Sequence, residues 1–94
     1  MIDVASVVRL APKARLRFDR LRQQHMLLYP ARGLVLSATA ADVVALLDET
    51  RAVSAIVERI VAKYGEENRA AIAQDILELL RDLADRGLVA EVTP

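Results

Sequence analysis

Polar and apolar residues alternate with a period of two in the first third of the chain. Residues 15–18 place Leu16 and Phe18 on one face of an extended segment and two arginines on the other. A second apolar run stops at Pro30, whose ring fixes φ and which has no N–H to donate to a neighbouring strand. The pattern predicts a small antiparallel meander with strands over residues 15–18, 25–29 and 34–37 and a turn over residues 30–33.

After Ser37 the apolar spacing changes to that of helices. Thr39 and Asp42 resemble a capping box at the start of a first helix. The apolar residues from Val53 to Tyr64 form a one-sided stripe at the spacing of a second helix, which Gly65 ends. A further apolar stripe indicates a third helix, which ends in a cationic last turn at Arg86 followed by Gly87. The stripe is made of Ile72, Ile76, Leu79, Leu80 and Leu83. We therefore predict helices over residues 39–49, 53–64 and 68–86, followed by a terminal strand over residues 88–92.

This order separates strands from helices and predicts the α+β class. We expect a small N-terminal three-stranded antiparallel sheet followed by a three-helix bundle similar to a winged helix-turn-helix. Residues 1–14 are interpreted as an N-terminal arm that is ordered only where it packs on something. Residues 15–94 are expected to form a single domain, because 94 residues cannot build a second core.

Composition adds a hint of an interaction surface. Hydrophobic residues make up 54% of the chain, and so short a chain cannot hide all of them in its own core. Thirteen basic and thirteen acidic residues cancel, yet residues 1–32 carry a net charge of +5 and residues 33–94 a net charge of −5. The first third of the chain is therefore basic and the rest acidic. The net charge of zero argues against a protein that binds polyanions in general.

The sequence offers no catalytic or metal-binding set of residues. It has no cysteine, and His25 is its single histidine, whereas a zinc site needs several nitrogen or sulfur donors. Its three glycines lie at predicted element ends and not in a phosphate-binding loop. We therefore expect no enzyme activity and no cofactor. With no long apolar run, no secretory signal and no cysteine, we expect a cytoplasmic protein without a membrane span.

A helix-turn-helix also raises the possibility of DNA binding. The outward face of the predicted third helix, however, carries the acids Asp75, Glu78, Asp82 and Asp85 against two arginines, so phosphate would meet like charge. A free strand edge beside an apolar helix can instead bind an extended peptide by β-augmentation. A third reading is a structural module whose excess apolar surface serves a homodimer.

An ordered set of residues over about 75 positions closely resembles the PqqD family, the peptide chaperones of pyrroloquinoline quinone (PQQ) biosynthesis. Glu49 departs from the family, which usually has glycine after Leu47-Asp48, and we expect this to alter the turn that follows. The resemblance is carried by Ala11-Pro12, Arg15-Leu16-Arg17-Phe18-Asp19, Arg22, Leu28-Tyr29-Pro30, Gly33, Val35-Leu36, Thr39-Ala40, Leu47-Asp48, Ile56, Tyr64, Asp75-Ile76, Leu79-Leu80, Leu83 and Gly87-Leu88.

The resemblance implies a RiPP recognition element, a non-catalytic domain that binds a ribosomally made precursor peptide. In this family the peptide is PqqA, and it is presented to the radical SAM enzyme PqqE. The family pattern adds the peptide to the third strand of the meander, against the third helix. Carried onto this chain, the peptide-binding candidates are Leu34, Val35, Leu36, Ser37, Ile76, Leu79, Leu80 and Leu83.

Overall fold

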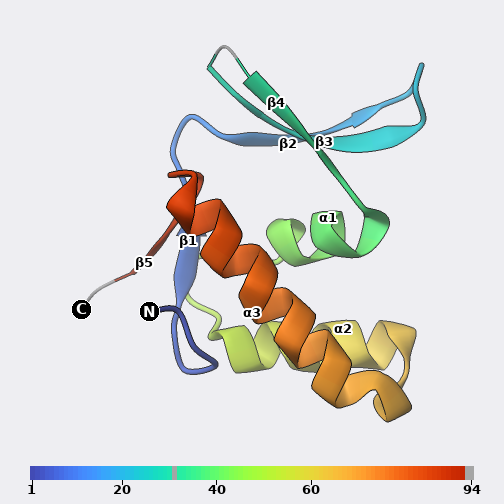
Figure 1. The fold of residues 1–94 in the computed structure, drawn as a ribbon, viewed down its shortest axis with the longest axis vertical. Helices are drawn as coiled ribbons and strands as arrows, with labels where there is room; N and C mark the ends of the chain where they lie inside the picture. Colours follow the sequence, from blue (N-terminus) through green and yellow to red (C-terminus); the bar gives the residue numbers. More distant parts are fainter. Residues whose placement is uncertain (31, 93–94) are drawn as a thin grey trace.

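The computed structural model describes residues 1–30 and 32–92 and contains five strands and three α-helices (Figure 1). Ala31, within the predicted turn, and residues 93–94, at the end of the predicted domain, lie outside the described residues. The elements are β1 (Val8–Leu10), β2 (Arg15–Asp19), β3 (Gln24–Tyr29), β4 (Arg32–Leu36), α1 (Ala38–Ala45), α2 (Val53–Tyr64), the short 3-10 helix η1 (Glu66–Asn68), α3 (Arg69–Asp85) and β5 (Val89–Glu91).

The strands form two separate antiparallel sheets. Strands β2, β3 and β4 make a three-stranded sheet in that order, at the top of the view in Figure 1 with α1 beneath it. Strands β1 and β5 pair with each other, with Val8 opposite Glu91 and Leu10 opposite Val89. This second pairing brings residues 8–10 and residues 89–91 side by side (Figure 1).

The core lies among the helices and under the inner face of the three-stranded sheet. Apolar stripes on α2 and α3 face each other, and Ile56, Ile60, Leu80 and Leu83 are almost completely buried between them. Helix α1 packs on all three strands of the larger sheet and on both other helices, so it joins the sheet to the helical part of the molecule. Leu27, at the centre of the sheet, is fully buried on this side.

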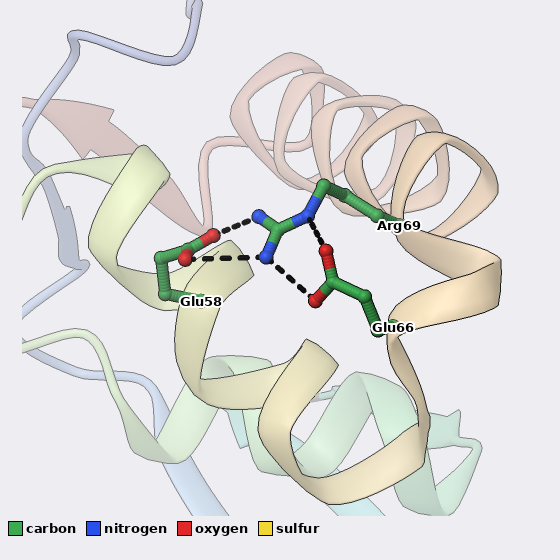
Figure 2. A network of polar contacts seen from close by, with 3 residues as sticks. All are labelled: Glu58, Glu66 and Arg69. Atoms are coloured by element: carbon green, nitrogen blue, oxygen red, sulfur yellow. Dashed lines mark hydrogen bonds and ion pairs between the residues drawn. The ribbon is translucent and has the colours of Figure 1, made fainter.

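The turn between α2 and α3 is fixed by glycine and by a polar network. Gly65 ends α2 with φ of 119°, a backbone conformation that glycine adopts without steric cost. Figure 2 shows the guanidinium group of Arg69 between the carboxylates of Glu58 and Glu66. Its Nε and Nη2 donate to Glu66 at 2.7 and 2.8 Å, and its Nη1 also pairs with Glu58. These two carboxylates, Glu66 first, raise the pKa of Arg69 above its ordinary value and tie the end of α2 to the start of α3.

The structure confirms the α+β class with three helices and antiparallel sheets. The sheet layout differs from the prediction, because five strands in two sheets replace one sheet and a lone terminal strand. The predicted turn over 30–33 extends too far, since Arg32 and Gly33 already belong to β4. Strand β1 was not predicted, because it has three residues and its partner lies about 80 residues away in the sequence.

The first predicted helix is shorter than expected and begins earlier. Ser37, and not Thr39, is its N-cap: the Ser37 Oγ accepts a hydrogen bond from the Ala40 amide at 3.1 Å. The helix ends at Ala45 instead of residue 49, and Arg51 donates to the Leu46 carbonyl at 3.0 Å. Glu49 lies in the loop that follows with φ of 67°, in the left-handed region that favours glycine.

Residues 1–14 pack on the rest of the molecule. Ile2 and Val8 are buried in the core, and Ala14 joins them just before β2. The backbone amides of Val53 and Ser54 donate to the carbonyls of Ser6 and Val4, both at 2.9 Å, which attaches this segment to the start of α2. No helix in residues 1–30 and 32–92 is long and apolar enough to cross a membrane.

Candidate functional site

A hollow of about 380 Å³ lies between the start of α1 and the exposed side of α3. Its α1 side begins at Ser37, the residue that directly follows β4, and its other wall is the first half of α3. Most of the lining side chains are aliphatic, with two hydroxyls and one carboxylate among them. The lining residues are Ser37, Thr39, Ala40, Val43, Ile72, Asp75, Ile76 and Leu79.

Strand β4 leads into this hollow and has a free edge. It pairs with β3 on one side, and no strand pairs with its other side in the described part of the chain. Leu34 and Leu36 face the core, while Val35, between them, points to the opposite face and is 56% exposed. The unpaired backbone edge of β4 can accept a further strand that continues toward the hollow.

The local sequence explains why the strand and the helix wall come together. Because Ser37 caps α1 immediately after β4 ends, no loop separates the strand from the first helical turn. On α3, Ile72, Ile76 and Leu79 recur at i, i+4 and i+7, so one stripe of the helix faces the hollow. The β4–α1 junction and the apolar stripe of α3 therefore form the hollow, and no loop in the described part of the chain contributes a lining residue.

A polar clip behind the hollow holds α1 against α2. Asp42 Oδ2 accepts hydrogen bonds from Lys63 Nζ at 2.8 Å and from the Tyr64 hydroxyl at 2.7 Å. The Lys63 bond, followed by the Tyr64 bond, holds the pKa of Asp42 below its ordinary value, and Asp42 in turn raises the pKa of Lys63. Since Asp42 precedes Val43, which lines the hollow, this clip also fixes the position of that wall.

The structure brings some of the eight sequence-predicted site residues together and separates others. Ser37, Ile76 and Leu79 line the hollow, and Val35 lies on the free strand with an exposed side chain. Leu80 and Leu83 have no exposed surface and belong to the core cluster, on a helix that packs against α2, α1 and β5. The side chains of the remaining two, Leu34 and Leu36, point into the core, so these residues can contact a ligand only through their backbone atoms.

Sequence reasoning missed the contribution of α1 and part of that of α3. Thr39, Ala40 and Val43 were assigned to a helix without a role in a site, and Ile72 and Asp75 were not among the candidates. Ile72 could have been found, because it starts the apolar stripe to which Ile76 and Leu79 belong. The three α1 residues had no signal of their own, since their position beside α3 depends on tertiary packing.

Residues 24–89 match the family model described as "Coenzyme PQQ synthesis protein D (PqqD)". The match covers β3, β4, all three helices and the first residue of β5, and therefore both walls of the hollow. The chain belongs to the PqqD family. The membership predicted from the sequence is confirmed.

Curated relatives and a solved structure cover nearly the whole chain. The "PqqA binding protein" of Rhodopseudomonas palustris (strain BisB5) is 39% identical over 90 residues, which is 96% of this chain and 87% of that protein. The "Bifunctional coenzyme PQQ synthesis protein C/D" of Methylorubrum extorquens is 38% identical over 85 residues, 90% of this chain but 23% of that protein. The solution NMR structure of the PqqD truncation of Methylobacterium extorquens PqqCD matches with a TM-score of 0.83 and 34% identity, covering 96% of this chain and 95% of that one.

The names of the relatives that match this chain over most of their own length describe binding and not a reaction. The solved structure is described as representing a functional, stand-alone RiPP recognition element, and the two Rhodopseudomonas palustris relatives from strains BisB5 and HaA2 are called PqqA binding proteins. The expectation that this chain is not an enzyme is confirmed.

Proposed function

We propose that this chain is a peptide chaperone that binds the ribosomal precursor PqqA and presents it to the radical SAM enzyme PqqE in PQQ biosynthesis. Binding of PqqA is supported by the names of its relatives and by the recognition-element structure that it resembles. The observation that carries the proposal is the free edge of β4, which leads directly into the apolar hollow beside α3.

Strand addition explains how a small protein without a deep cavity can hold a flexible peptide. Each backbone hydrogen bond with the edge of β4 contributes about 0.5–1.5 kcal/mol, independently of the guest sequence. Selectivity then comes from the guest side chains that enter the hollow, because each buried methylene adds about 0.8 kcal/mol. Leu34, Val35, Leu36 and Ser37 contribute mainly main-chain atoms in this account. Leu79 contributes apolar surface, and the buried Ile76 forms the floor beside it. Leu80 and Leu83 support the helix from behind.

The opposite edge of the same sheet is less suited to a guest strand. Strand β2 carries Arg15 and Arg17 on one face, and charged residues on an edge strand disfavour the addition of further strands. The described residues of β4 beyond Arg32 are uncharged. This difference directs an extended peptide to β4, the edge that has the hollow beside it.

Presentation to PqqE follows from holding the peptide without enclosing it. A strand bound at a sheet edge keeps its far side exposed, so an enzyme can reach it while the chaperone raises its effective concentration. The short η1 connection between α2 and α3 also supports the winged helix-turn-helix-like description that the family resemblance implies.

Two leucines on α3 provide a matched test of the hollow. Leu77 and Leu79 are both half-buried, but Leu79 alone of the two lines the hollow. We expect Leu79→Ala to weaken PqqA binding about tenfold, the loss of about 1.4 kcal/mol of apolar contact, and Leu77→Ala to leave it within about twofold. Isothermal titration calorimetry measures both, with circular dichroism to confirm the fold. Equal affinities for the two variants would contradict the proposed site.

A further inference from the structure

The outer face of the three-stranded sheet has no covering element among the described residues. Strand pairing places Arg17, Met26 and Val35 in one row across this face, and Arg15, Leu28 and Gly33 in the next. Met26 and Leu28 are half-buried although α1 packs on the other side of the sheet. A shallow hollow of about 330 Å³ lies here, lined by Arg17, Phe18, Asp19, Arg20, Met26 and Leu28. We call this surface the outer sheet face.

Gly33 keeps the outer sheet face flat and lets its apolar side chains meet. A Cβ atom at this position would lie 2.9 Å from Met26 Cε and 3.2 Å from Leu28 Cδ2. These side chains therefore occupy the space above the glycine and form a continuous apolar centre with the exposed Val35.

The rim of this face carries a concentrated positive charge. Residues 15–22 hold four arginines and one aspartate, a net charge of +3. None of these arginines forms an ion pair with any other residue in the described ranges, and Asp19 accepts instead from the backbone amides of Leu21 and Arg22. The four arginines are Arg15, Arg17, Arg20 and Arg22.

Protection of an edge strand explains only part of this arrangement. Arginines at positions 15 and 17 of β2 do discourage strand addition there. That role does not require Arg20 and Arg22 in the adjoining hairpin, nor an apolar centre of Met26, Leu28 and Val35 beside them. An apolar centre with a charged rim is instead the usual anatomy of a protein interface.

We propose that the outer sheet face is the surface that docks PqqE, through an acidic patch of the enzyme surrounding at least one apolar side chain. This inference rests on the proposed function, which supplies the enzyme as the partner. Electrostatic complementarity requires a negatively charged surface on the partner, because carboxylates would form ion pairs with the unpaired arginines. The apolar centre requires that the partner also contribute apolar surface.

A second copy of the chain and a nucleic acid fit this surface less well. In a two-fold symmetric dimer through this face, the basic rims would lie against each other, so like charges would repel. A phosphate backbone would meet the arginines but leave the apolar centre without a partner, and the chain has no net positive charge to attract it.

The position of this face fits simultaneous binding of peptide and enzyme. The guest strand occupies the edge of β4, while the enzyme covers the face of the same sheet, so neither blocks the other. Val35 belongs to both regions, because it lies on the edge strand and points to the outer face. The peptide is thereby held next to the surface on which the enzyme docks.

Two double variants, each replacing two arginines by glutamates, separate the effect of charge on the outer sheet face from the effect of the net charge of the chain. Arg15→Glu/Arg17→Glu changes the outer sheet face, and Arg9→Glu/Arg59→Glu makes the same change in net charge at exposed positions on β1 and α2. We expect the first variant to bind PqqE at least about tenfold more weakly, mainly through slower association, and the second to remain within about twofold. Wild-type binding should also weaken steeply between low and high salt. Biolayer interferometry with purified PqqE measures the rates.

The controls make each outcome decisive. Circular dichroism checks the fold, and Arg15→Gln/Arg17→Gln replaces the reversal if that variant does not fold. Equal PqqE binding by the two charge-reversed variants would overturn the inference. It is also overturned if the β2 arginines are needed instead for self-association in sedimentation or for retention of duplex DNA. Calorimetry with PqqA alone tests the proposed function separately: wild-type protein that fails to bind the peptide refutes that function, whereas intact peptide binding with unchanged enzyme binding refutes only the docking surface.

Discussion

The three-stranded sheet and the helical body differ in the pairing of their charged side chains and in the burial of their apolar ones. In the helical body, made of α1–α3 with β1 and β5, four cationic side chains pair with acids, and most of the buried core is located there. In residues 15–36, which make the sheet and its hairpins, the five arginines lack an acidic partner among the described residues, and Leu27 and Leu36 are the buried members. The contrast indicates that the body supplies stability and the sheet supplies recognition surface.

The β1–β5 pair belongs with the stable body, and its removal should have the largest effect. Deleting residues 1–10 takes Ile2 and Val8 out of the core, at a cost of about 1.5–3 kcal/mol each, and also removes the partner of β5. We expect a loss of at least about 4 kcal/mol, a large fraction of the stability of a domain of this size. Urea unfolding followed by circular dichroism measures it. If residues 11–94 unfold at the same urea concentration as the whole chain, residues 1–10 are a dispensable arm.

Paired and unpaired arginines should respond differently to loss of charge. Arg69→Gln removes the network with Glu58 and Glu66 (Figure 2) and should lower the thermal unfolding midpoint. Arg17→Gln removes no ion pair and relieves repulsion from Arg15, so the midpoint should stay unchanged or rise slightly. Differential scanning calorimetry of both variants at low salt makes the comparison. A larger loss for Arg17→Gln would break the distinction between the two regions.

The Asp42 clip should give the smallest effect, one that depends on pH. Because the folded state lowers the pKa of Asp42, its contribution is present above the unfolded pKa of about 4 and is lost as the pH falls through the folded pKa. We expect Asp42→Asn to be less stable than wild type by about 1 kcal/mol or less at pH 7, and the difference to shrink below pH 4. Chemical unfolding between pH 3 and 7 measures this trend. A difference that grows as the pH falls would contradict the assignment.

The sequence predicted elements well where the pattern is local. The stripe from Val53 to Tyr64 and the glycine after it predicted α2 with its observed bounds, because helix periodicity and a C-terminal glycine are encoded by neighbouring residues. Strand β1 was not predicted, because its pairing with β5 depends on residues at the other end of the chain. The N-cap of α1 was misplaced at Thr39, because Ser37 and Thr39 are both residue types that cap helices and the end of β4 decides between them.

The site shows the same division between local and tertiary information. Helix periodicity identified the apolar stripe of α3 but not which side of it is free, so Leu80 and Leu83 were grouped with Ile76 and Leu79. Burial separates half-buried Leu79 from Leu80 and Leu83, while Ile76 lines the hollow although it is 2% exposed. This difference follows from packing between elements far apart in the sequence. For the same reason Val43, from α1, emerges as part of the wall only in the folded structure.

The location of the bound peptide is the most direct test of the account. Isotope-labelled protein titrated with PqqA should show its largest amide chemical-shift changes along β4, residues 32–36, and along α3 between Ile72 and Leu79. Backbone amides of β4 should also become protected from hydrogen exchange in the complex, because they gain partners on a second side. Changes that cluster instead along β2, or around the β1–β5 pair, would contradict strand addition beside the hollow.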